Sequence, residues 1–508
     1  DLFFYFTYKT AGLAGLFSFR YFCVSLLVIE CYLLARKSGI LTKPATWLIC
    51  LLAVLMSYSA IVAKSEIFSF LFICLFAFNW WYIRTEGDTG WGKCYFFPII
   101  MLLWVNSHGG FVFGIVFLIC IGTGELLNGL TGNENKLSAK TRKHLFIALI
   151  LSVLSLFLTP YGYKYLYQLF YFFLPTKENL TTISNIAAYG SPFRPEDKDA
   201  IGFVVQVNIS IAILFLLYIR NFRKVEWSSL LANLVFVFLY TRFYRTTFYW
   251  APVFLFSSLS LLTLRPLAIL ERKRWITTLL VPIITVGISA WIAGSALYKA
   301  TFFPERDCWV GYGIGDMNPV AEAEYIKKNY PTARIGNTYD EGAYLLWKLW
   351  PDNKIFIDAR HFPFREWDSE YWKIFSSDLV YKKPAIASDF LQRYPCDLWC
   401  VGRSNIAMSY WFLFSPDWQL AFYGKSASIF VRKGIPLPKK SQRFSADLNT
   451  LKNFGTAFDV LNWVVTIQDW QAVDLVLERM RKYFIHPEHQ KLIHQYEIAL
   501  QSAKKNTL

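Results

Sequence analysis

The first three hundred residues consist of long apolar runs separated by short polar loops. The runs are about 17 to 25 residues long, the length that an α-helix needs to cross the hydrocarbon core of a bilayer. The longer run 95–127 is interrupted near its middle and fits two short, closely packed crossings. Residues 1–300 are therefore predicted to form a mainly α-helical transmembrane domain with about nine or ten spans. The single runs lie at residues 13–35, 45–63, 67–83, 145–159, 202–219, 227–241, 248–264 and 275–298.

The pattern changes after residue 300. Between residues 301 and 435, short stretches of strand type alternate with stretches of helical period, which predicts a small α/β domain. The predicted helices are residues 318–331 and 341–350, and the predicted strands are 333–339, 354–360, 396–403 and a hairpin at 418–434.

Residues 436–508 form a third region, which opens with a Pro/Lys linker at 436–440. The rest has helical period and is predicted to form three antiparallel helices. A tryptophan and small residues at packing positions make these helices similar to one or two degenerate tetratricopeptide-type repeats. Such a unit does not bury its apolar face alone, so we expect it to pack on the α/β domain or on a partner protein.

Composition and charge support a membrane location. The chain has 508 residues, of which 55% are hydrophobic, and a formal net charge of +16. Its basic residues cluster in loops that fall on one face of the predicted topology, which the positive-inside rule makes cytoplasmic. We therefore expect a multi-pass membrane protein with extracytoplasmic C-terminal domains, and no nucleic-acid partner. The clusters are Arg36/Lys37/Lys43, Arg84/Lys93, Lys136/Lys140/Arg142/Lys143, Arg220/Arg223/Lys224 and Arg265/Arg272/Lys273/Arg274.

The interruption in run 95–127 is the most informative stretch. Five consecutive polar or permissive residues, from Asn106 through His108 to Gly110, break an otherwise apolar sequence. Within a bilayer such a break is tolerated only against protein or a water-filled cavity, and an ionisable residue there suggests a functional site. The alternative is a tight turn in which the glycines permit close packing and His108 caps a helix end.

Two arginines form a second candidate site on the same outward face. In the stretch TRFYRTTFYW, Arg242 and Arg245 are spaced i, i+3, which on a helix places both guanidinium groups on one side. Arginine binds phosphate in a bidentate manner and stays charged in a partly dry site. The alternative is that both side chains extend to the interface beside an aromatic belt.

The polar half offers weaker signals. Asp358 and Arg360 follow a predicted strand, and we interpret them as a pair that orders a loop. No glycine-rich fingerprint follows any predicted strand, so nucleotide binding is not supported. Cys396 and Cys400 could form a disulfide on an extracytoplasmic face, but their spacing does not indicate a zinc site.

Several motifs occur in an order that resembles a known group of proteins. They are LLWVNSHGGFVFG, LTPYGYKY, SPF, the RFYR turn, GNTYDEGAYLLWKLWP and KIFIDARHF. Together they resemble large bacterial inner-membrane proteins related to GT-C glycosyltransferases, which are polytopic enzymes that use polyprenyl-phosphate sugars. The resemblance extends from the GLAGL stretch to about residue 434, and several of these bacterial proteins also end in tetratricopeptide-like repeats.

The resemblance implies a GT-C-like architecture and transfer of a sugar from a polyprenyl-phosphate donor to an extracytoplasmic acceptor. His108 and Asn106 would then bind the donor together with Arg242 and Arg245, which would hold the phosphate leaving group. In this family a catalytic acidic residue lies in the first outer loop, often in a pair that binds a divalent metal. The chain begins at Asp1 within what resembles the end of that loop, so we expect an N-terminal segment to precede it and assign no catalytic residue.

Two departures from the family pattern favour an alternative function. No acidic pair can be named in the part of the first loop that the chain covers, and Asn185 and Tyr189 stand where the group often has an acidic-aromatic pair. A chain of this ancestry could instead be a non-catalytic subunit that assembles a larger membrane complex through its periplasmic α/β and repeat regions. A transporter is the weaker interpretation, because the span pattern contains no inverted repeat.

Overall fold

In the computed structural model the chain divides into two compact units, one formed by Asp1–Asn179 with Ile186–Trp291 and the other by Leu180–Asn185 with Ile292–Leu508. The structure describes residues 2–57, 65–174, 191–193, 201–264, 318–358, 365–375, 383–438 and 453–507, together with isolated positions elsewhere. Several sequence expectations lie outside the described residues, namely most of run 275–298, Asn185, Tyr189 and Arg360.

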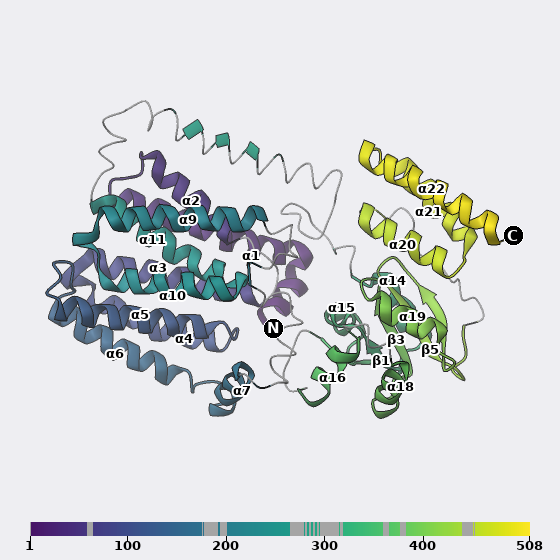
Figure 1. The fold of residues 1–508 in the computed structure, drawn as a ribbon. Helices are drawn as coiled ribbons and strands as arrows, with labels where there is room; N and C mark the ends of the chain where they lie inside the picture. Colours follow the sequence, from purple (N-terminus) through teal and green to yellow (C-terminus); the bar gives the residue numbers. More distant parts are fainter. Residues whose placement is uncertain are drawn as a thin grey trace. The chain divides into compact units, whose positions relative to one another are not determined.

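The first unit is a bundle in which most helices run alongside one another (Figure 1). Their apolar side chains form one large core, with α11 buried on nearly all sides. Helices are interrupted by short 3-10 turns η2 (Gly87–Tyr95), η5 (Phe222–Lys224) and η6 (Tyr244–Thr246). The helices are α1 (Leu2–Lys37), α2 (Pro44–Met56), α3 (Glu66–Glu86), α4 (Phe96–Val105), α5 (Phe111–Leu130), α6 (Ala139–Ser155), α7 (Tyr163–Phe173), α9 (Ile201–Arg220), α10 (Trp227–Arg242) and α11 (Thr247–Leu264).

Five helical segments among the described residues are long and apolar enough to cross a membrane. The sequence predicts about nine or ten crossings, and the difference lies partly in short helices. Helices α6 and α10 occupy two of the predicted runs but have only 17 and 16 residues, and α2 has 13. The five segments are Leu2–Lys37, Glu66–Val105, Phe111–Leu130, Phe203–Arg220 and Tyr244–Leu264.

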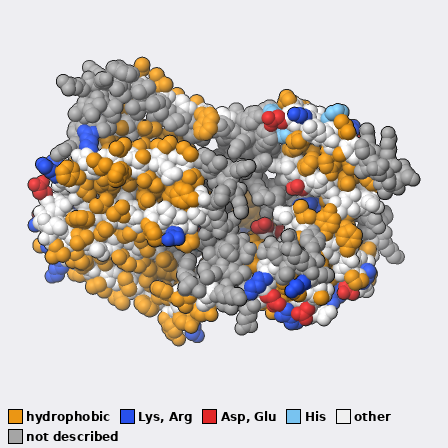
Figure 2. Space-filling view, in the orientation of Figure 1, with side chains coloured by type: hydrophobic (Ala, Val, Ile, Leu, Met, Phe, Trp, Pro, Cys, Tyr) orange, Lys and Arg blue, Asp and Glu red, His pale blue; other side chains and the backbone are white. Residues whose placement is uncertain are grey.

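The surface of the bundle is largely apolar, as the orange side chains in Figure 2 show. Large aliphatic and aromatic side chains point outward from helices on several sides, for example Ile119, Ile150 and Phe215, each about 60% exposed. A soluble protein rarely exposes contiguous apolar area on this scale, whereas lipid-facing helices do so as a rule. The surface is therefore compatible with a membrane protein.

The predicted break in run 95–127 is confirmed. Helix α4 ends at Val105 and α5 begins at Phe111, and the two helices pack closely on either side of the turn. A Cβ atom on Gly114 would lie 2.6 Å from the Trp104 ring, so the glycine lets α5 approach α4. Small residues permit such contacts between apolar helices that have no hydrophobic driving force in lipid.

Among the described glycines of the bundle, Gly124 lies closest to the backbone of another helix, at the contact between α5 and α10. A Cβ atom on Gly124 would lie 2.2 Å from the Cα atom and 2.4 Å from the backbone nitrogen of Ser228. Because backbone atoms cannot move aside as a side chain can, position 124 requires glycine for this packing.

The second unit contains a five-stranded mixed sheet of order β2-β1-β3-β5-β4. Strand β1 pairs in parallel with β2 and β3, while β3, β5 and β4 are antiparallel. The small α/β domain predicted from the sequence is thus present. Its strands are β1 (Arg334–Asn337), β2 (Lys354–Ile355), β3 (Leu398–Gly402), β4 (Trp418–Tyr423) and β5 (Ala427–Arg432), and its helices are α14 (Val320–Asn329), α15 (Tyr339–Leu349), α16 (Arg365–Phe375), α18 (Pro384–Arg393) and α19 (Ile406–Phe414).

The two faces of this sheet pack against separate apolar cores, and Cys396 and Cys400 lie in different cores. Successive residues of a strand point to opposite faces, so Trp399 packs in one core and Cys400 in the other. Cys396 belongs to the core of Trp399. Cys396 and Cys400 are both buried free thiols, and the disulfide considered from the sequence is wrong.

The predicted C-terminal helices are α20 (Phe454–Thr466), α21 (Trp470–Tyr483) and α22 (Pro487–Thr507). They share one apolar core with a face of the sheet. The Tyr423 hydroxyl donates to Asp469 over 2.8 Å, and the Arg403 guanidinium lies 5.1 Å from the Trp463 ring. The expected packing of the tail on the α/β domain is confirmed, while its repeat character stays a prediction.

Candidate functional site

Three segments of the bundle meet at one end. These are the first turn of α3, the turn 106–110 between α4 and α5, and the junction between η6 and α11. They are joined by a hydrogen bond between Ser69 and His108 and by an ion pair between Glu66 and Arg245. We call Glu66, Ser69, His108 and Arg245 the outer cluster, because the predicted topology places this end outside the cytoplasm.

His108 is held in one orientation by two hydrogen bonds to the same ring nitrogen. The backbone N–H of Gly110 donates to Nδ1 over 3.1 Å, and Ser69 Oγ lies 2.7 Å from Nδ1. Since Nδ1 accepts, a neutral ring carries its proton on Nε2 and the Ser69 hydroxyl donates. The Ser69 oxygen in turn accepts the Trp104 indole N–H over 2.8 Å. This chain of donors leaves the Nε2 side of the ring as the one able to donate elsewhere.

Gly110 makes this geometry possible. A Cβ atom there would lie 2.2 Å from the Tyr249 hydroxyl and 2.4 Å from Ser69 Oγ. The close packing expected for a plain tight turn is therefore present, and His108 does accept an N–H at the start of α5. These contacts are compatible with both interpretations of the turn.

Arg245 and Glu66 form the charged part of the outer cluster. Their Nη2 and Oε2 atoms are 3.0 Å apart, and the side chains are 27% and 18% exposed. A pair at this depth is partly desolvated yet still reachable by a solute. Glu66 and Ser69 are spaced i, i+3 on α3, so the carboxylate and the His108 anchor share one helix face.

Arg242 and Asn106 lie outside the outer cluster. Helix α10 ends at Arg242, and Phe243 is extended with φ −135° and ψ 105°, so the two arginines do not share a helical face as predicted. Arg242 is exposed, and its guanidinium lies 5.7 Å from the Phe238 ring. Asn106 donates to the carbonyls of Leu102 and Leu158. Of the four predicted site residues, His108 and Arg245 take part in the outer cluster.

The sequence prediction did not assign Glu66, Ser69 and Tyr249 to the site. Glu66 is visible in the sequence as the acidic residue at the start of an apolar run, but its arginine partner lies in a distant segment. Among the described residues, no group of three or more His, Cys, Asp or Glu side chains is arranged to hold a metal ion. The outer cluster can bind an anion at Arg245 and accept a proton at Glu66.

The opposite end of the bundle holds a second charged group, the inner cluster, formed by Arg84, Glu125, Asn128, Ser228 and Glu226. Glu125 is fully buried, and its Oε1 lies 2.7 Å from Arg84 Nη1. It also accepts from Asn128, Ser228 and the backbone N–H of Leu137. Arg84 additionally donates to the Asn135 carbonyl and lies 3.6 Å from Glu226.

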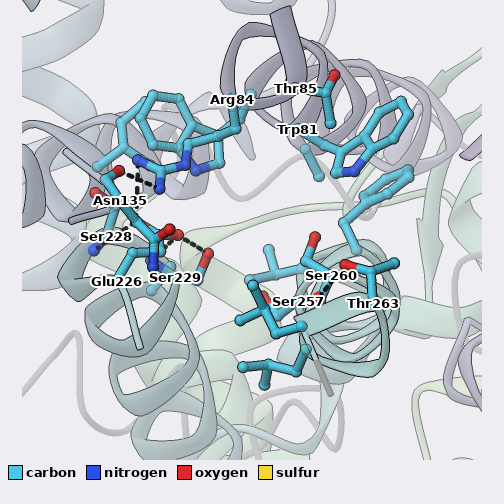
Figure 3. Close-up of a pocket in the computed structure, with 18 of the residues that line it drawn as sticks. Trp81, Arg84, Thr85, Asn135, Glu226, Ser228, Ser229, Ser257, Ser260 and Thr263 are labelled. Atoms are coloured by element: carbon cyan, nitrogen blue, oxygen red, sulfur yellow. Dashed lines mark hydrogen bonds and ion pairs between the residues drawn. The ribbon is translucent and has the colours of Figure 1, made fainter. Parts of the chain in front are cut away.

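Beside the inner cluster is a recess with a cavity volume of about 190 Å³. Figure 3 shows Arg84, Glu226 and Asn135 on one side of it and Trp81 and Ser260 on the other. The recess is lined by polar residues at the helix ends and by Phe117, Val253 and Phe256 deeper in the bundle.

The second unit contains buried charges of its own. Glu322 accepts from the backbone N–H groups of Ser426 and Ala427, and Arg403 donates to Ser428 and to the Gly424 carbonyl. These bonds tie the β4–β5 hairpin to neighbouring segments. Asp358 is buried at the end of the segment after β2, while its proposed partner Arg360 lies outside the described residues.

Glu341 is a further buried charge of the second unit, but it does not tie the hairpin to other segments. Its side chain accepts a hydrogen bond from the Thr338 hydroxyl. Burial raises the pKa of this carboxyl to about 7, with the Thr338 hydrogen bond opposing the shift. A carboxyl with a pKa in this range changes charge near neutral pH.

Comparison of the chain with models of known protein families and with curated proteins gives no match.

Proposed function

We propose that this chain is a membrane glycosyltransferase-like protein that transfers a sugar from a polyprenyl-phosphate donor to an extracytoplasmic acceptor. The proposal rests on one observation, the pairing of Arg245 with Glu66 beside His108 at one end of the bundle. A transferase of this kind needs a cation for the phosphate leaving group and a base for the acceptor hydroxyl. The order of motifs that resembles GT-C proteins supports the same class.

In the proposed reaction the acceptor oxygen attacks the anomeric carbon of the donor sugar. The bond between that carbon and the phosphate oxygen breaks, and the phosphate leaves on the lipid with the bonding electron pair. Arg245 stabilises the charge that develops on the phosphate, since a guanidinium binds phosphate oxygens in a bidentate manner. Glu66, released from Arg245 when the phosphate binds, takes the proton of the acceptor hydroxyl. The Nε2–H of His108 is available to a donor oxygen.

The polyprenyl monophosphate left after transfer provides a probe that does not depend on the sugar. The purified wild-type protein is expected to retain polyprenyl monophosphate in native mass spectrometry. Arg245→Lys keeps the charge but loses the bidentate geometry, and we expect binding to weaken about tenfold. Arg223→Lys, an exposed arginine at the other end of the bundle, serves as the matched control. Equal retention by wild type and Arg245→Lys would contradict the proposal.

A second candidate function is assembly of a membrane complex through the C-terminal helices. It is favoured by apolar side chains on this tail that remain exposed although its other face is buried, namely Leu475, Ile485, Leu492 and Ile498. Crosslinking in native membranes, with a photoreactive residue at position 492, separates the two candidates. A defined protein adduct together with no retention of polyprenyl monophosphate would favour assembly.

A further inference from the structure

The recess beside the inner cluster lies far from the outer cluster. Helices α3, α5 and α11 all begin at the outer cluster and end at the recess. Glu66 and Arg84 are 18 residues apart on α3, which corresponds to about 27 Å along the helix axis. This is close to the roughly 30 Å thickness of a bilayer's hydrocarbon core. The recess is thus a separate feature at the basic end of the bundle.

The recess has a polar mouth and an apolar interior. Its lining on α11 runs from Val253 to Leu264, about 16 Å at the rise of an α-helix. Ser257 and Ser260 face it from α11, between apolar residues. Polar side chains in an apolar helix are costly unless they face protein or a ligand-accessible space. A slot with this profile fits an amphiphile that has a polar head and a hydrocarbon chain.

The acceptor groups around the mouth are already occupied. Glu226 accepts from the backbone N–H groups of Ser228 and Ser229 and from the Ser229 hydroxyl, and it lies near Arg84. Glu125 is likewise saturated. A ligand that presents a cation or several donors would therefore find no free carboxylate here.

Donors, in contrast, remain available. The Trp80 side chain lines the recess and is only 5% exposed, and its indole N–H has no hydrogen-bond partner among the described residues. The exposed ammonium of Lys224 also lines the recess and forms no ion pair within the described part of the chain. The indole nitrogen is enclosed by protein, so a ligand rich in acceptor oxygens would pair with the exposed Lys224.

We propose that the recess binds an anionic glycerophospholipid, with the phosphate at Lys224 and one acyl chain in the apolar interior between α3 and α11. The site is independent of the proposed transferase reaction. It lies on the face that the basic loops make cytoplasmic, where anionic lipids supply such headgroups.

The test compares phosphatidylglycerol with phosphatidylcholine carrying identical acyl chains. Both lipids have the same ester and phosphate oxygens, but the choline cation offsets the charge of the phosphate. We expect the delipidated protein to bind phosphatidylglycerol more tightly in native mass spectrometry titrations and to gain thermal stability with it. Lys224→Gln is expected to weaken this binding about tenfold, the loss of one charge-assisted hydrogen bond.

Two controls separate a built site from general attraction to basic loops. Arg223→Gln removes an exposed charge that does not line the recess, and it should leave binding within about twofold of wild type. Ser260→Phe fills the slot and should abolish binding, whereas Leu234→Phe adds the same ring at a site on α10 that is 57% exposed. Equal affinity for the two lipids, or equal losses in Lys224→Gln and Arg223→Gln, would overturn the proposal. Should Ser260→Phe not fold, the comparison of Lys224→Gln with Arg223→Gln decides alone.

Discussion

The two ends of the bundle each hold a carboxylate paired with an arginine, but the two pairs differ in their surroundings. Glu125 in the inner cluster is fully buried and accepts from Arg84, Asn128, Ser228 and a backbone N–H. Glu66 in the outer cluster is 18% exposed, and Arg245 is its ion-pair partner among the described residues. The first carboxylate is committed to the fold, whereas the second can exchange its partner.

This difference indicates which cluster can do chemistry. A saturated buried network stabilises one arrangement and leaves no atom for a substrate. A partly exposed ion pair contributes little free energy, so little stability is lost when a phosphate replaces the Glu66 carboxylate at Arg245. The comparison can be tested by perturbing each cluster in turn.

The largest effect is expected for Glu125→Ala. The substitution leaves the partly buried Arg84 guanidinium with Glu226 as its ion-pair partner among the described residues, and it removes the acceptor for three other groups. Breaking a buried ion pair on one side costs about 3–5 kcal/mol. Unfolding of the protein in mixed micelles with increasing denaturing detergent measures the loss. A cost similar to that of Glu66→Ala would contradict the distinction between the clusters.

Glu341 is a buried carboxylate in the second unit. It tests how burial with few hydrogen-bond partners changes the pKa of a carboxyl group. Its pKa is raised to about 7 in the folded protein, so the folded state binds the proton more tightly than the unfolded chain does. The contribution of protonated Glu341 to the free energy of unfolding is complete below the unfolded pKa of about 4.5 and is lost as the pH rises through 7. Over this window it amounts to about 3 kcal/mol.

Amide hydrogen exchange in the full chain checks this expectation. After correction for the intrinsic pH dependence of exchange, protection of α15 and β3 should fall between pH 5 and pH 7.5. Glu341→Gln stays neutral throughout and should flatten that dependence. An unchanged pH profile in Glu341→Gln would assign the effect to another group.

Gly124 near the inner cluster and Gly110 in the outer turn allow the two ends of the bundle to be compared by adding a methyl group at each. Gly124→Ala places a methyl group against the backbone of Ser228, whereas Gly110→Ala meets the ends of the Tyr249 and Ser69 side chains. We expect Gly124→Ala to cost about 2–3 kcal/mol and Gly110→Ala about 1 kcal/mol, because side chains move more easily than backbone. The same detergent titration compares them, and a larger cost for Gly110→Ala would reverse the assignment.

The smallest change in stability is expected for Glu66→Gln, below about 1 kcal/mol for a partly exposed pair. Its effect on ligands should be distinctive. Loss of the carboxylate frees Arg245, so retention of polyprenyl monophosphate should increase by up to about tenfold. Transfer of a sugar, measured with the same membranes, should be lost with the base. Weaker retention in Glu66→Gln would mean that Arg245 does not bind the phosphate.

Much of the fold follows from the sequence because its signals are local. The break at residues 106–110, the strands and the first two helices after residue 318, and the three C-terminal helices all depend on periodicity and on turn residues nearby. Helices α16, α18 and α19 were not predicted. The candidate site depends on contacts between distant segments, which local patterns do not contain. Arg245 could be singled out by its charge. Its partner Glu66 and the extended Phe243 that separates it from Arg242 became evident only in three dimensions.

The close approach of α5 to α10 at Gly124 also bears on how freely this sequence can vary. A Cβ atom on any other residue would overlap the backbone of Ser228, so this position strongly favours glycine. Exposed Asn106, whose amide bonds two carbonyls at the rim of the turn, has no such restriction. A saturation library selected for folded protein should therefore return glycine at 124 and a broad mixture at 106.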